Sequence, residues 1–170
     1  MVDLKEFEQK AADLRVLGMK ISIGQDTVYE KYWDEDCRRN IYSASKSFTS
    51  CAVGFAVQEG LIDLDERLMD AFKEDIPNNP DENLKKATVK DLLTMTLGQE
   101  KGFLMGKQRP RMEEQNWVKA SLAIPFVYEP GTHFVYNNVG PYLAGILVQR
   151  RAGCDLLSYL TPRLLKPYGR

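Results

Sequence analysis

The chain has 170 residues, of which 44% are hydrophobic and 28% charged, and its formal net charge is −1. This length predicts one domain with a sizeable core, and the nearly balanced charge gives no electrostatic reason to expect binding to nucleic acid or to a membrane surface. No apolar stretch approaches the length of a membrane span and no signal peptide is visible, so we expect a cytoplasmic protein, or a secreted one if a leader has been removed.

The first 33 residues show the pattern of a helix followed by a β-hairpin. Apolar residues recur at helical spacing over 4–17, and Gly18 follows as a stop signal. Apolar and polar residues then alternate over 19–23 and again over 27–33, on either side of a Gly-Gln-Asp turn. These two segments are therefore predicted to be paired strands, and a polar connection leads on to the next helix.

The stretch 41–60 is predicted to contain the most apolar helix of the chain. Apolar residues lie on every side of its second half, and Gly60 provides a natural end. Because a helix that is apolar all round is usually buried, we expect this one inside the protein, with Cys51 as a small core residue. The chain has three cysteines without metal-like spacing, so neither a metal site nor a cofactor is expected.

The rest of the chain is predicted to consist of short helices joined by loops. Segment 66–72 is a weak helical turn, whereas 76–82, with two prolines and two asparagines, is predicted to be a loop. The glycine-rich and charged stretch 99–111 is the longest loop and a candidate for motion or substrate access. Helical patterns with end signals follow at four places: 88–98, 112–123, 139–151 and 155–164.

Two residues at the start of the apolar helix form the first candidate site. Ser43 and Lys46 are three positions apart and so share one face of the first helical turn. This spacing places an oxygen nucleophile beside a base at the positive end of the helix dipole. Ser-x-x-Lys alone says little, because a chain of this length holds on the order of one by chance. The alternative is a capping serine next to a surface lysine.

A second polar group follows a Pro-Gly turn later in the chain. The tripeptide Tyr136-Asn137-Asn138 stands between this turn and the predicted helix over 139–151. Taken alone, it would be a loop tyrosine followed by a turn-forming Asn-Asn pair. His133, the single histidine, lies in the same region and is predicted to be structural.

Taken together, the two motifs resemble those of the serine β-lactamase and penicillin-binding-protein superfamily, where Ser-x-x-Lys carries the nucleophile. The similar branch, related to class C β-lactamases, D-amino-peptide peptidases and esterases, has Tyr-x-Asn as its second motif. The resemblance covers nearly the whole chain and rests on four phrases in the family's order: 42–49, 59–65, 88–96 and 129–138.

The resemblance implies an α+β, β-lactamase-like fold for residues 1–170 as a single domain. Residues 1–41 would supply a helix and a hairpin to an antiparallel sheet, and residues 42–170 would form the helical part. The family's third motif, Lys-Thr-Gly or His-x-Gly on a C-terminal strand, does not occur. We therefore expect the N-terminal part of a longer enzyme: a truncated form, a proteolytic product or a partial gene.

The resemblance also implies roles for four residues. Ser43 would attack an amide or ester carbonyl to form a covalent acyl-enzyme, and Lys46 would hold or take its proton. Tyr136 would act with Lys46 as general base, then as acid toward the leaving group. Asn138 would hydrogen-bond Lys46 and the substrate, which would be a β-lactam, a D-amino peptide or a short ester.

The absent third motif bears on activity and on partners. We expect the chain alone to be weakly active or inactive, and the open edge of its hairpin to be covered by a second copy or by a complementing C-terminal segment. Two other interpretations stay open: a non-catalytic relative that binds a peptide-like ligand, and a purely structural helical module.

Overall fold

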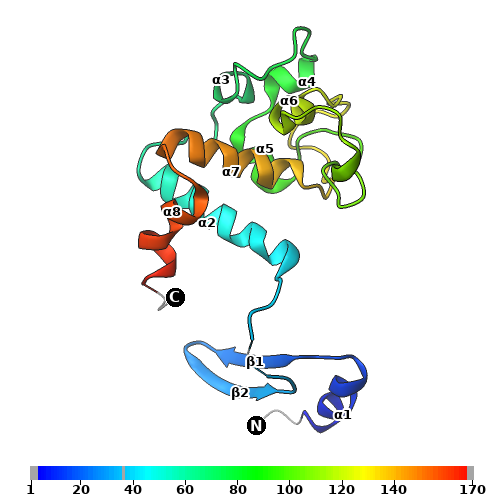
Figure 1. Cartoon of the computed structure of the whole chain (residues 1–170), viewed down its shortest axis with the longest axis vertical. Coiled ribbons are helices and arrows are strands. Elements are labelled where there is room, and N and C mark those ends of the chain that lie inside the picture. The colour runs from blue at the N-terminus through cyan, green and yellow to red at the C-terminus, as the bar shows by residue number, and fades with distance from the viewer. Residues whose placement is uncertain (1–3, 36, 168–170) are drawn as a thin grey trace. The chain divides into compact units, whose positions relative to one another are not determined.

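The computed structural model describes residues 4–35 and 37–167, which form an α+β chain (Figure 1). The α+β class predicted from the sequence is confirmed, with helices and a two-stranded antiparallel sheet. The chain divides into two compact units, Met1–Ile41 and Tyr42–Arg170. Within the described ranges, no helix is both long and apolar enough to cross a membrane.

The first unit contains the predicted helix and hairpin: α1 (Lys5–Asp13), β1 (Gly18–Ile23) and β2 (Asp26–Tyr32). The strands pair antiparallel, and the register shifts once, between Ile21 and Ser22. Helix α1 contacts the end of the hairpin through the rings of Phe7 and Trp33, which meet edge to face with centroids 6.0 Å apart. The helix is shorter than the predicted 4–17 because Arg15 has a left-handed φ of 53°, which a helix does not continue.

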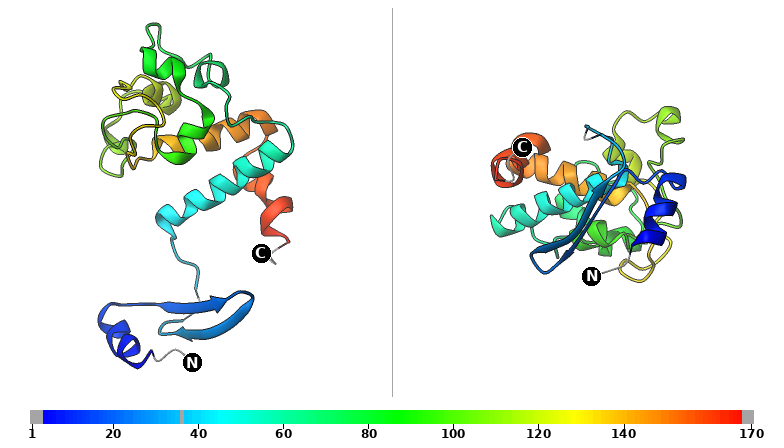
Figure 2. Two further views of the ribbon diagram at one scale, coloured as in Figure 1. Left: turned by 180° about the vertical axis from the view of Figure 1, so that it is seen from behind. Right: turned by 90° about the horizontal axis from the view of Figure 1, so that it is seen from below.

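Two long helices form the framework of the second unit. In both views of Figure 2, α2 (Ser45–Gln58) and α7 (Val139–Ala152) lie side by side. Helix α7 also packs on α5 (Val89–Thr94), where a Cβ at Gly140 would lie only 2.2 Å from the Leu92 carbonyl oxygen. Glycine at this position therefore allows the two backbones to approach this closely.

Short helices complete this unit. They are α3 (Leu68–Ala71), α4 (Glu82–Lys86), α6 (Trp117–Leu122) and α8 (Leu156–Leu160), with turns of other helix types at η1 (Tyr42–Ala44), η2 (Arg109–Arg111) and η3 (Thr161–Leu165). Helix α4 was not predicted from the sequence; it begins at this point because the Asp81 carboxylate accepts from the Leu84 amide at 2.7 Å. The predicted start of α5 is confirmed by a capping box between Thr88 and Asp91.

Helix α2 is not buried on all sides, contrary to the prediction. Ala52, Val53 and Ala56 are buried in the core that includes α7. The opposite face is accessible, with Phe48 41% exposed and Cys51 also exposed. The apolar pattern identified the helix correctly but could not tell which side other elements cover. The prediction that Cys51 is a core residue is therefore wrong for this chain.

Candidate active site

The nucleophile candidate Ser43 lies where a 3₁₀ turn leads into α2. Its Oγ accepts a hydrogen bond from Nζ of Lys46 at 3.0 Å, as expected for two residues that share one face of a helical turn. No side chain caps the start of α2. The capping alternative would require the Ser43 hydroxyl to bond to a backbone amide of the helix. Among the described contacts, this hydroxyl instead bonds to side chains of the candidate site.

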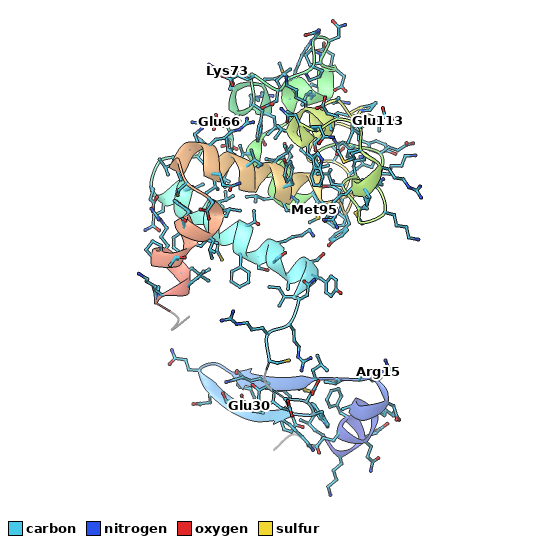
Figure 3. The ribbon with its side chains drawn as sticks, viewed as in Figure 1. Arg15, Glu30, Glu66, Lys73, Met95 and Glu113 are labelled. Atoms are coloured by element: carbon cyan, nitrogen blue, oxygen red, sulfur yellow. The ribbon has the colours of Figure 1, made fainter. Side chains whose placement is uncertain are left out.

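Tyr136 reaches the same serine from a distant part of the sequence. Its hydroxyl donates to Ser43 Oγ at 2.7 Å. The segment before it has no regular secondary structure. Two backbone bonds fasten this segment to the end of α5: Gly131 donates to the Thr96 carbonyl at 2.9 Å, and Val135 to that of Met95 at 3.0 Å. Met95, at the end of α5, is labelled in Figure 3.

The charge of Lys46 also acts on the phenol of Tyr136. Nζ of Lys46 lies 5.3 Å from the centroid of the Tyr136 ring. The pKa of Tyr136 is held below its usual value of 10, first by the hydrogen bond with Ser43 and then by Lys46, while partial desolvation opposes the shift. The arrangement therefore makes the phenolate, the form of Tyr136 that can accept a proton, easier to form than in a free tyrosine.

Asn138 does not make the predicted hydrogen bond to Lys46. Its Nδ2 donates to the carbonyl oxygen of Leu104 at 3.0 Å and lies 3.5 Å from the sulfur of Met105. The loop 99–111 supplies these partners, and nothing in the spacing of the Tyr-x-Asn motif indicated that it would reach this side chain.

Asn137 has a structural role that the sequence analysis missed. It is 1% exposed, and its Oδ1 accepts from the Gly140 amide at 3.1 Å. Its Nδ2 donates to the carbonyl of Val135, also at 3.1 Å. Asn137 therefore binds a backbone amide in the first turn of α7 and fixes the backbone between Tyr136 and Asn138. An asparagine two positions before the helical pattern was the available signal.

His133 and the three cysteines are the remaining residues that the sequence analysis singled out. The ring of His133 stacks on Tyr128 with centroids 4.2 Å apart, and its Nδ1 pairs with the Thr132 hydroxyl, which agrees with a structural role. The thiols of Cys37, Cys51 and Cys154 are free and exposed. In the part of the chain that the structure describes, no group of three or more His, Cys, Asp or Glu side chains could hold a metal ion.

Comparisons with known proteins give a consistent family. The family described as Beta-lactamase matches residues 5–170. Monacolin J acid methylbutanoyltransferase from Aspergillus terreus is 30% identical over 156 residues, which cover 80% of this chain and 37% of that protein. Lovastatin esterase from Penicillium rubens is 30% identical over 149 residues, which cover 75% and 37%. The chain thus spans well under half the length of these curated relatives.

Solved structures share the fold over nearly the whole chain. The octameric penicillin-binding protein homologue from Pyrococcus abyssi has a TM-score of 0.71 at 26% identity, and the match covers 99% of this chain and 43% of that one. A class C beta lactamase has a TM-score of 0.73 at 19% identity, with 96% and 47% covered. At that identity, the second match supports the fold alone.

Proposed function

Because the chain belongs to the beta-lactamase family, we propose that it carries out acyl transfer from a carboxylic ester through a covalent acyl-enzyme on Ser43. The observation that carries this proposal is the contact of one serine oxygen with both an ammonium and a phenol, Lys46 at 3.0 Å and Tyr136 at 2.7 Å. A serine hydroxyl is a weak nucleophile by itself, and a neighbouring proton acceptor activates it.

The first half of the reaction follows from these contacts. In the reactive form Tyr136 is a phenolate, stabilised by the positive charge of Lys46, and it takes the proton of Ser43 as Oγ bonds to the ester carbonyl carbon. The tetrahedral intermediate collapses when the bond to the leaving alcohol breaks, and Tyr136 returns its proton to that oxygen. The product alcohol departs, and the acyl group stays on Ser43 as an ester.

The second half runs the same steps with a new acceptor. A water molecule or an alcohol gives its proton to Tyr136 and bonds to the acyl carbon. Ser43 then leaves and recovers a proton from Tyr136. Water yields a carboxylic acid, whereas an alcohol yields a new ester. The choice of acceptor decides whether the protein acts as an esterase or as an acyltransferase.

Carboxylic esters are favoured over β-lactams by the curated relatives. The proteins at 30% identity carry the names of a methylbutanoyltransferase and an esterase, whereas the class C beta lactamase is 19% identical. Tyr136 is 44% exposed, so a substrate can approach its side chain. A β-lactam or a D-amino peptide as the better substrate is an alternative outcome of the test.

The test combines turnover with active-site labelling on the longest form that the gene encodes. We expect hydrolysis of p-nitrophenyl butyrate and stoichiometric labelling by a fluorophosphonate, both lost in Ser43→Ala. Ser45→Ala, two residues away at the start of α2, is the matched control and should keep both. Labelling that persists in Ser43→Ala would refute the assignment, and a folded protein with neither labelling nor turnover would support the non-catalytic alternative.

A further inference from the structure

The loop 99–111 and the residues that follow it as far as α6 enclose a cavity of about 440 Å³, a size typical of small-molecule sites. Its apolar lining consists of Phe103, Met112 and Ala120, which are only partly exposed. Phe103 and Met112 also pack against the hydrophobic core, so this apolar surface is fixed to the folded unit. A ligand with an apolar part would cover it and remove it from water.

Two cations line the same cavity. Lys107 and Arg111 are exposed, and neither forms an ion pair or a side-chain hydrogen bond with any residue that the structure describes. Lys85, an exposed lysine of α4, does find a carboxylate, that of Glu82 at 2.6 Å. Both cations of the cavity are therefore available to a negatively charged ligand.

The carboxylates of the cavity limit how much negative charge it accepts. Glu114 is engaged at the start of α6, where its Oε1 accepts from the Asn116 amide at 2.7 Å. Glu113, labelled in Figure 3, also lines the cavity, and its carboxylate has no such contact within the described ranges. One free carboxylate against two cations is balanced by a single negative charge, whereas a doubly charged phosphate group would be repelled by Glu113.

Backbone bonds hold the turn that carries both cations. The carbonyl of Met105 accepts from the amides of Gln108 at 2.8 Å and Arg109 at 3.2 Å, and the Arg111 amide donates to the Gln108 carbonyl at 2.9 Å. In return, the Met105 amide donates to Oε1 of Gln108, also at 2.9 Å. Because the turn is held by the chain's own bonds, a ligand loses less free energy to ordering it.

We propose that this cavity binds an amphiphilic monocarboxylate, an apolar chain or ring that ends in one carboxylate. The carboxylate lies between Lys107 and Arg111, whose guanidinium can bind both of its oxygens. The apolar part covers the apolar lining of the cavity. The cavity shares no lining residue with the Ser43 site, so the inference does not depend on the proposed acyl transfer.

The test compares three ligands with one chain length on the longest form that the gene encodes. Octanoate is the probe, octan-1-ol has no charge, and octylammonium has the opposite charge. Binding is followed by NMR of isotope-labelled methionine methyl groups. We expect octanoate to bind about 3- to 20-fold more tightly than octan-1-ol, as two exposed charge pairs allow, and octylammonium to bind most weakly. The Met112 signal should move, whereas that of Met69, in α3 and outside the cavity, should not.

Variants then assign the binding to the two cations. Arg111→Gln and Lys107→Gln should each weaken octanoate binding about 2- to 5-fold and leave octan-1-ol almost unaffected. Glu113→Gln removes the opposing charge and should strengthen octanoate binding. Arg109→Gln is the matched control, because it changes the net charge equally on the same loop but at a residue outside the lining. It should leave the affinity for octanoate nearly unchanged.

Any of four results would overturn the inference: no measurable binding of octanoate, equally tight binding of octan-1-ol, equal losses in Arg109→Gln and Arg111→Gln, or a shift of the Met69 signal in place of Met112. Loss of octanoate binding in Lys46→Met would also overturn it, since the carboxylate would then lie at the Ser43 site. Failure of the proposed function reads out separately, as absent turnover and absent Ser43 labelling, and neither enters these titrations.

Discussion

The hydroxyl of Tyr136 lies 2.7 Å from Oγ of Ser43, although 93 positions of sequence separate the two residues. Neither residue belongs to a long element. Ser43 stands in a 3₁₀ turn before α2, and Tyr136 in an irregular segment that Asn137 joins to α7. The packing of α2 on α7 therefore brings the starts of the two helices, and with them the two side chains, to one place.

If Tyr136 moves the proton, Tyr136→Phe should lower kcat of ester turnover by about 10²–10⁴-fold, the usual contribution of a general base, with a smaller change in KM. The change removes one oxygen and keeps the ring beside Lys46. Tyr128→Phe, at the tyrosine that stacks on His133, is the control and should leave kcat near wild type. Turnover of p-nitrophenyl butyrate measures both, and an unaffected Tyr136→Phe would exclude this role.

The lowered pKa of Tyr136 gives a pH prediction with a definite sign. Because the phenolate is the active base, kcat/KM should rise with pH through the pKa of Tyr136, which lies below 10. Lys46→Met removes a cause of the lowered pKa, so the rise should move to higher pH. Lys46→Arg keeps a positive charge and should shift the rise in kcat/KM by less. Identical pH profiles for the two variants would show that the charge of Lys46 does not act on Tyr136.

Local signals in the sequence predicted much of the fold. The hairpin followed from alternating apolar and polar residues, and α5 and α7 from the helical patterns that begin at 88 and 139. Helix α7 ends at Gly153, which has a left-handed φ of 68°. Helix α6 begins at Trp117, later than the predicted 112, because Asn116 accepts from the first amides of the helix. Each of these features depends on residues close in sequence.

Features that depend on distant contacts were not predictable in this way. The spacing in Ser-x-x-Lys is local, so the contact between Ser43 and Lys46 followed from it. The partner of Asn138 did not, because Leu104 is 34 positions away and its φ is unusual. The exposed face of α2 is a similar case, since an apolar pattern does not say what covers it.

Because α5 and α7 lie so close together, adding one methyl group at Gly140 should lower the free energy of unfolding clearly. In Gly140→Ala the new Cβ would meet the Leu92 carbonyl oxygen, a backbone atom that moves only with its helix. We expect a loss of about 1–3 kcal/mol in the free energy of unfolding, as for overpacked cores. Gln149→Ala, a less buried position on the same helix, should stay within about 0.5 kcal/mol. Urea denaturation measures both, and equal stabilities would contradict the contact.

A cluster at the other end of α2 predicts how stability depends on pH. The Glu59 carboxylate accepts from Nε of Arg163 at 2.6 Å and from the Tyr159 hydroxyl at 2.8 Å. Arg163 first, and then Tyr159, hold the pKa of Glu59 below its usual 4.5. Burial, followed by Glu59, raises the pKa of Tyr159 to about 12. Both shifts stabilise the folded chain between these limits.

Folding stability changes with pH in opposite directions at the acidic and the basic end of this pH range. A carboxyl with a lowered pKa contributes stability above about 4.5, and this is lost as the pH falls through its folded pKa. A phenol with a raised pKa contributes stability below about 10, which is lost as the pH rises toward 12. Glu59→Gln should therefore lower the melting temperature clearly at pH 7, by an amount that shrinks below pH 4.5.

The matched control is Glu82→Gln, which removes an ion pair with Lys85 at 2.6 Å from a carboxylate whose side chain is 82% exposed. Such exposed pairs contribute little, because water screens them and ordering two long side chains costs entropy. We expect almost no change in melting temperature for this variant at any pH. Thermal unfolding followed by circular dichroism at pH 7 and pH 3.5 tests the pair. A deficit in Glu59→Gln that is the same at both pH values would show that the ionised carboxylate does not stabilise the junction of α2 with α8 and η3.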